Sequence, residues 1–153
     1  MKIYVASSWR NERQPVVVES LRAAGHEVYD FRHPSEGDNG FSWRQITPTP
    51  RPWPPSLTIE VLNHPVAIAG FGKDHAAMEW ADAFVMVLPC GKSAHLELGW
   101  ACGAGKPSFI LMENDDEPEL MYREVISTGG RICASIDDVL SGLSGVDVKK
   151  EGE

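Results

Sequence analysis

Glu97 is an acidic residue whose setting in the sequence favours chemistry. It follows a short apolar run, Phe84 to Leu88, whose length and valine content predict a strand buried on both faces. After a turn, Ser93 is a good N-cap for a helix beginning at Ala94. Glu97 then lies in the first helical turn or just past it, where free N–H groups and the helix dipole favour an ionised carboxylate. Such a carboxylate can serve as a nucleophile or a general base, or it can be a solvated acid that only complements the dipole.

The rest of the chain predicts alternating strands and helices. Four further apolar runs are predicted as strands: Lys2 to Ala6, Glu27 to Phe31, Pro107 to Met112 and Arg131 to Ala134. The helical patterns cover residues 12–24, 74–81, 118–127 and 136–143. This alternation predicts an α/β fold of the flavodoxin-like (Rossmann-like) kind, with a five-stranded parallel sheet in the order 2-1-3-4-5 and helices on both faces. In that order ligands bind between strands one and three, so residues 7–10 should meet residues 90–97.

The length of 153 residues suits one domain, which we place at residues 1–143. The polar and charged residues 144–153 are predicted to form a flexible tail. Residues 34–58 hold six of the 11 prolines, and no regular element is expected there. Two interpretations stay open for this loop: a surface excursion pinned by Trp43 and Trp53, or a lid in which Phe41 or Trp43 offers a stacking surface.

Composition narrows the class of protein. Asp and Glu number 22 against 14 Lys and Arg, and the resulting net charge of −8 argues against binding to nucleic acid or to an anionic membrane. No apolar run approaches the ~20 residues that span a bilayer, and the first residues lack the layout of a signal peptide. The three cysteines, Cys90, Cys102 and Cys133, have no metal-site spacing and suit reduced thiols. We therefore expect a cytoplasmic protein without a metal site.

Familiar ligand-binding motifs fail at single positions. Gly91-Lys92-Ser93 is similar to the end of a phosphate-binding P-loop, but Met86 stands where that loop needs its first glycine. Cys90 followed by a loop suggests a cysteine phosphatase, but Leu96 stands where that loop needs an arginine. The histidines show no convincing metal spacing.

Four short stretches match segments of one enzyme family. They are Ile3-Tyr4-Val5-Ala6-Ser7-Ser8-Trp9, then Asp74 placed eight residues before Asp82, then Leu96-Glu97-Leu98-Gly99-Trp100-Ala101, and finally Glu119-Leu120-Met121. On these residues the chain resembles the nucleoside 2-deoxyribosyltransferase family, which includes the deoxynucleoside 5′-monophosphate N-glycosidases. The resemblance extends from Lys2 to about Leu143. Asp82 itself is interpreted as a structural turn residue.

The resemblance implies a retaining glycosyl transfer without a metal or organic cofactor. Glu97 would attack C1′ of the nucleoside and form a glycosyl-enzyme ester, and Asp74 would help the base to depart. A second base, or water, would then attack the ester. Tyr4 would hold Glu97 by a hydrogen bond, and Trp9 would line the base pocket. Met121, with Glu119, would reach into a neighbouring subunit's site, so a homo-oligomer of at least two subunits with shared active sites is expected.

The possible functions differ in whether the substrate carries a 5′-phosphate. Glu119 stands where the transferases have an amide and the monophosphate hydrolases have a hydroxyl, and a carboxylate there would accept a bond from a 5′-OH but repel a 5′-phosphate. Ser8, Arg10 and Ser93 are instead similar to phosphate contacts of the hydrolases. The expected function is transfer of 2-deoxyribose between nucleobases. The alternatives are a hydrolase of nucleoside 5′-monophosphates and a non-catalytic nucleotide-binding module on the same fold.

Overall fold

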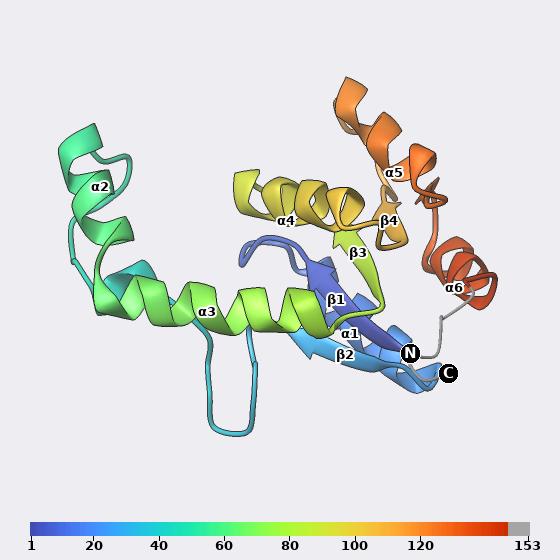
Figure 1. Cartoon of the computed structure of the whole chain (residues 1–153), viewed down its shortest axis with the longest axis horizontal. Coiled ribbons are helices and arrows are strands. Elements are labelled where there is room, and N and C mark those ends of the chain that lie inside the picture. The colour runs from blue at the N-terminus through green and yellow to red at the C-terminus, as the bar shows by residue number, and fades with distance from the viewer. Residues whose placement is uncertain (147–153) are drawn as a thin grey trace. The chain divides into compact units, whose positions relative to one another are not determined.

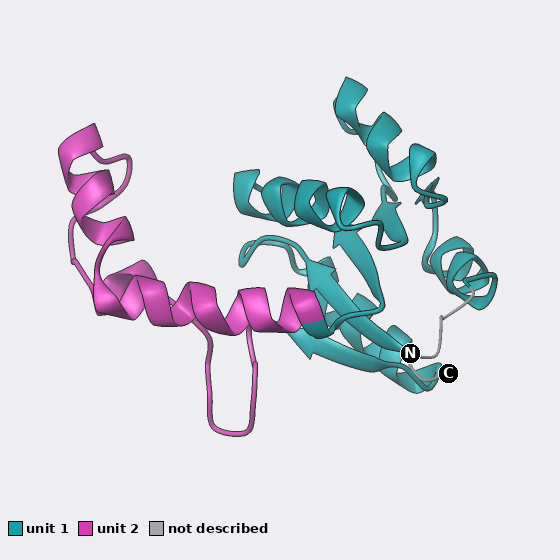
Figure 2. Ribbon diagram, viewed as in Figure 1, with its two compact units in different colours: residues 1–30, 80–153 teal, residues 31–79 magenta. Residues whose placement is uncertain are grey.

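The structure is a computed structural model that describes residues 1–146. The chain divides into two compact units (Figure 2): unit 1 contains residues 1–30 and the chain from residue 80 onward, and unit 2 contains residues 31–79. The predicted extent of one domain over residues 1–143 stays a prediction. Of the predicted tail, residues 147–153 lie outside the described part of the chain. None of the helices in the described part is both long and apolar enough to cross a membrane.

The five strands of unit 1 form one parallel sheet in the order β2-β1-β3-β4-β5, which confirms the predicted fold class. The strands are β1 (Lys2–Ala6), β2 (Glu27–Asp30), β3 (Ala83–Val87), β4 (Ser108–Leu111) and β5 (Arg131–Cys133). β3 lies at the centre and is buried at every position, which explains why its sequence is a continuous apolar run. Asp82, just before it, accepts a hydrogen bond from the backbone N–H of Lys2 at 2.7 Å, which supports its structural interpretation.

Helices cover both faces of the sheet in unit 1 (Figure 1). They are α1 (Arg13–Ala23), α4 (Lys92–Gly103), α5 (Arg123–Ser127), α6 (Ile136–Ser144) and the 3-10 helix η2 (Leu120–Tyr122). α1 and α6 pack on the face lined by Ile3, Val5 and Val85, where the main hydrophobic core lies. α4 and α5 pack on the opposite face. Because side chains alternate along a strand, Tyr4 and Phe84 belong to the α4 face.

Two helices of unit 1 differ from the predicted ones. α4 begins at Lys92 after an extended Gly91, so Ser93 lies inside the first turn and is not the N-cap. Gly91 is therefore the N-cap of α4. Glycine is a common N-cap residue, although it has no side chain to bond the free N–H groups of the first turn. The helix expected over residues 118–127 is shorter and divided, with η2 followed directly by α5.

Unit 2 corrects the expectation that residues 34–58 hold no regular element. It contains the 3-10 helix η1 (Trp43–Gln45), α2 (Pro55–Leu62) and most of α3 (Pro65–Trp80). Ser42 and Gln45 form a reciprocal capping box around η1. Both α2 and α3 begin at a proline, which suits the first position of a helix because the missing N–H has no helical partner there. Some prolines of unit 2 therefore begin helices instead of preventing them.

The aromatic residues of unit 2 pack against one another. The rings of Phe41 and Trp43 meet edge to face with centroids 4.8 Å apart, and Trp43 and Trp53 do so at 5.4 Å. Phe41 also lies against Gly70 of α3, where an added Cβ would come within 2.9 Å of the ring. These contacts favour the interpretation that the tryptophans pin this segment. The alternative, a lid, stays a prediction.

Candidate active site

The ends of β1 and β3 are joined by one buried amide. The Asn11 side chain is 5% exposed, and its Nδ2 donates to the carbonyl oxygens of Val87 at 3.1 Å and Pro89 at 3.2 Å. It also lies 3.1 Å from Ser7 Oγ, which donates to the same Val87 carbonyl at 2.8 Å. The residues after β1 and after β3 therefore meet at one edge of the sheet, as the predicted strand order requires.

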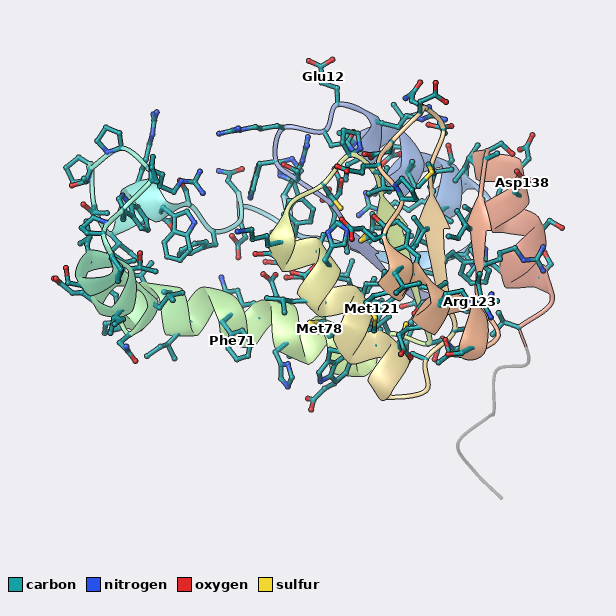
Figure 3. All side chains as sticks on the ribbon, turned by 90° about the horizontal axis from the view of Figure 1, so that it is seen from above. Glu12, Phe71, Met78, Met121, Arg123 and Asp138 are labelled. Atoms are coloured by element: carbon teal, nitrogen blue, oxygen red, sulfur yellow. The ribbon has the colours of Figure 1, made fainter. Side chains whose placement is uncertain are left out.

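Three predicted site residues lie at the exit of β1. Ser8 Oγ accepts a hydrogen bond from the backbone N–H of Arg10 at 3.2 Å, which closes a tight turn. Trp9 is 51% exposed, and the Arg10 side chain is exposed too. The connection runs on through Glu12, which projects outward (Figure 3). Within one copy of the chain, the Arg10 guanidinium has no carboxylate partner among residues 1–146, so it is available to an anionic ligand.

Tyr4 is held in a row of aromatic rings on the α4 face of the sheet. Its ring stacks on Tyr29 of β2 with centroids 5.4 Å apart and on Phe84 of β3 with centroids 4.9 Å apart. Phe84 in turn contacts Trp100 of α4 at 6.1 Å. Tyr4 is 1% exposed, so its ring has one fixed position. A buried tyrosine hydroxyl normally has a hydrogen-bond partner, which makes Tyr4 suited to orienting a polar group above the sheet.

Glu97 lies on the side of α4 that packs on the sheet. The buried residues Ala94, Leu98 and Ala101 mark that side, and Glu97 is three residues after Ala94 and four before Ala101. Its side chain is half-buried rather than solvated. As the sixth residue of α4 it lies just past the first turn, so the helix dipole acts on it less than in the first turn. The sequence allowed Glu97 to be a solvated acid that only complements the helix dipole. Its half-buried position beside the sheet-facing residues of α4 does not fit that alternative.

The carboxylate of Glu97 acts electrostatically on Cys90, at the exit of β3. Burial, with smaller contributions from the nearby carboxylates of Asp116 and Glu97, raises the pKa of the Cys90 thiol to about 12. Glu97 is therefore close to the turn that follows β3. The same pKa leaves Cys90 protonated near neutral pH, so it is a poor nucleophile, and the cysteine-phosphatase interpretation fails on this ground as well.

Glu119 and Met121 lie in a segment that projects from unit 1. Glu119 is the extended residue before η2, and Met121 is 66% exposed. Tyr122, which follows, is buried, and burial raises its pKa, with further contributions from Cys90, Asp116 and Glu119. Ser93 is exposed in the first turn of α4. The structure thus places this segment near the β3 exit of the same unit.

Asp74 belongs to unit 2. It lies on α3 and is half-buried. Its neighbour Lys73 forms an ion pair with Asp38 at 2.6 Å, and this pair ties the start of the aromatic segment to α3. Among residues 1–146, no group of three His, Cys, Asp or Glu side chains is arranged to hold a metal ion.

Sequence reasoning missed three residues that organise unit 1. Asn11 is the first of them. Its Oδ1 accepts from the backbone N–H of Arg13 at 2.9 Å, and its amide nitrogen joins the exit of β1 to the end of β3, at Val87 and Pro89, which are 76 and 78 residues away. His95 was dismissed for lack of metal spacing, yet it bonds Tyr122 at 3.0 Å. A polar residue in the short connection after a buried strand is the signal that points to Asn11, while nothing in the sequence pairs His95 with Tyr122.

The fold and the position of these residues define a class: a parallel α/β sheet with its polar residues at the switch point between β1 and β3. Solved structures with this fold include a 2-deoxyribosyltransferase from Bacillus psychrosaccharolyticus, at 22% identity and a TM-score of 0.54, covering 96% of this chain and 93% of that chain. A conserved protein from Enterococcus faecalis V583 is 18% identical with a TM-score of 0.59, covering 94% of this chain and 97% of that one. A CMP N-glycosidase from Clostridium botulinum is 16% identical with a TM-score of 0.49, covering 94% and 99%.

These comparisons bear on the fold. The expected resemblance to the nucleoside 2-deoxyribosyltransferase family is confirmed at that level, over nearly the whole chain. No family model and no curated protein matched the sequence. Activity must therefore be argued from the site itself.

Proposed function

We propose that this protein cleaves the N-glycosidic bond of 2′-deoxynucleosides and transfers the 2-deoxyribosyl group to another nucleobase, with Glu97 as nucleophile. The observation that carries the proposal is the position of Glu97: a half-buried carboxylate on the sheet-facing stripe of α4, close to the β3 exit. The fold shared with a 2-deoxyribosyltransferase supports it. Tyr4, buried on the same face of the sheet, is proposed to orient the carboxylate.

The proposed reaction has two displacements at C1′. In the first, a Glu97 carboxylate oxygen forms a bond to C1′ while the C1′–N bond breaks, and the departing base takes up a proton. The family resemblance assigns Asp74 to help that proton transfer, and we keep this role as a proposal. In the second, a nitrogen of another base attacks C1′ and the ester bond breaks, so the configuration at C1′ is retained. The chemistry uses carboxylates and needs no redox step.

An exchange assay tests this function. The protein is incubated with a deoxynucleoside and a different free base, and the products are separated by chromatography. A new deoxynucleoside carrying the second base supports transfer, whereas release of the first base alone would show a hydrolase. If neither product forms with deoxynucleosides or their monophosphates, the protein is a non-catalytic nucleotide-binding module.

The second candidate function is hydrolysis of nucleoside 5′-monophosphates. Three side chains favour it: the exposed guanidinium of Arg10, with Ser8 beside it at the exit of β1, and Ser93 in the first turn of α4. The first turn of a helix also favours a phosphate. Glu119 argues against this candidate if a neighbouring copy places it at the sugar's 5′ end, because a carboxylate repels a phosphate dianion in a partly dry cleft.

Glu119 is therefore expected to decide the substrate. The wild-type protein should have a higher kcat/KM for deoxynucleosides than for their monophosphates, and Glu119→Ser should shift the preference toward the monophosphate by roughly ten- to a hundredfold, because the serine hydroxyl can donate to a phosphate. Steady-state kinetics on both substrates measures this. Glu117→Ser, two residues away and exposed, is the matched control. A wild-type preference for the monophosphate would instead favour the hydrolase.

The active protein is expected to be at least a dimer. Leu120 is 82% exposed and Met121 66%, both beside the proposed sugar-binding acid Glu119. Exposed apolar side chains are stabilised when a second copy of the chain buries them. We propose that a neighbouring copy buries Leu120 and Met121 in this way. Sedimentation velocity combined with activity at falling protein concentration measures this. A fully active monomer would remove Glu119 and Met121 from the proposed site.

A further inference from the structure

His95 joins the helix that carries Glu97 to the segment that carries Glu119. Its Nδ1 lies 2.8 Å from the carbonyl oxygen of Gly91, and its Nε2 lies 3.0 Å from the hydroxyl of Tyr122. A carbonyl oxygen can only accept, so Nδ1 must carry the proton. In the neutral ring Nε2 is then a bare acceptor, and the Tyr122 hydroxyl donates to it.

The two rings are also packed together. Their planes are 15° apart and their centroids 5.8 Å apart, so His95 and Tyr122 stack as well as bond. His95 is two residues before Glu97 on α4, and Tyr122 is the last residue of η2. The contact therefore fixes η2 against the part of α4 that carries the proposed nucleophile.

Tyr122 anchors a segment that is otherwise open to solvent. Tyr122 is buried, while Leu120 and Met121 just before it are exposed. Together with the backbone hydrogen bond from the Tyr122 N–H to the Glu119 carbonyl at 3.0 Å, the His95–Tyr122 bond holds the end of this segment against α4. Loss of the bond would free the segment without touching Glu97.

We infer that His95 is a positioning residue: through Tyr122 it sets where Glu119 and Met121 project, so that they close the sugar end of the site in a neighbouring copy. This inference rests on the proposed function. The competing interpretation is that the His95–Tyr122 contact only stabilises unit 1. The two differ in what changes when the bond is lost, because positioning affects substrate binding in a neighbour, whereas stability alone affects the amount of folded protein.

The first test removes either end of the bond. Tyr122→Phe deletes only the hydroxyl, and His95→Phe keeps a ring in the stack. Each is expected to raise KM for a deoxynucleoside about two- to twelvefold, the value of one hydrogen bond, with kcat changed less than about twofold. The double variant should be no worse than His95→Phe, because that single change already removes the bond to Tyr122 along with the bond to the Gly91 carbonyl. Ser127→Ala, which deletes a hydroxyl bonded within α5 at 2.8 Å, is the matched control and should leave both constants unchanged.

A second measurement does not depend on activity. Backbone hydrogen exchange at residues 119–122 should become faster in Tyr122→Phe and His95→Phe but not in Ser127→Ala. Unchanged exchange in both variants would overturn the inference even if the protein were inactive on every nucleoside. Unchanged KM in an active protein would overturn it while leaving the proposed function intact.

Mixed assemblies test whether the segment acts on a neighbour. Chains with Glu97→Ala and chains with Tyr122→Phe are coexpressed with different affinity tags, and the assemblies that carry both tags are isolated. Sites with an intact Glu97 then receive an intact Tyr122 segment from the other chain, so KM should return to the wild-type value. If KM stays at the Tyr122→Phe value, the segment serves its own subunit and the inference is wrong.

Discussion

Replacing Glu97 with alanine is expected to abolish base release while the protein stays folded. The side chain provides the nucleophile of the proposed reaction, and loss of such a group costs on the order of 10⁴-fold or more in rate. Alanine is a good helix former and the site is only half-buried, so α4 should persist. Chromatographic detection of the free base measures the rate, and circular dichroism checks the fold.

The control for this result is an acid outside the proposed site. Glu124→Ala removes an exposed carboxylate from α5 and should keep wild-type activity. Glu97→Gln keeps the shape of the side chain without its charge and should be as inactive as Glu97→Ala. A Glu97→Ala protein that still releases base would remove Glu97 from the nucleophile role.

Asp74→Asn is expected to lower the rate of base release by about 10²–10⁴-fold, the usual value of general acid assistance. The loss should be smaller than that caused by Glu97→Ala, because the bond to C1′ can still form. It should also shrink with a substrate whose base departs easily, since such a base needs less help from a proton. Steady-state kinetics on two nucleosides with different leaving bases measures both effects.

Glu79→Gln provides the comparison for Asp74→Asn, since it changes an exposed acid on the same helix. It should have little effect on either substrate. Wild-type kinetics in Asp74→Asn would return Asp74 to a structural role on α3.

The sheet could be predicted because each strand is a short apolar run with a clear boundary. Lys2 to Ala6 was predicted with the bounds it has, and the strand order followed from the alternation of strands and helices. Glu97 was found because it follows a central strand closely. Its position on the inward stripe of α4 became clear only when Ala94 and Ala101 were seen to be buried.

Other features could not be predicted, for physical reasons. The segment after residue 34 was expected to be irregular because of its prolines, but Pro55 and Pro65 stand at the first positions of helices, where proline costs little. α3 was expected to begin only at residue 74, because Gly70 and Gly72 weaken the helical pattern before it. The His95–Tyr122 bond joins residues 27 positions apart, and only tertiary packing brings them together.

The position of β1 between β2 and β3 has a consequence for synthesis on the ribosome. β1 and β2 are made within the first thirty residues, but the other edge of β1 pairs with β3, and unit 2 is synthesised in between. At about 5–20 residues per second, those roughly fifty residues delay β3 by about 3–10 s. Until β3 pairs with it, that edge of β1 has no partner, and an unpaired apolar edge is the feature that recruits other strands or a chaperone. The interruption between β2 and β3 thus lengthens the time for which one edge of β1 waits for its partner strand.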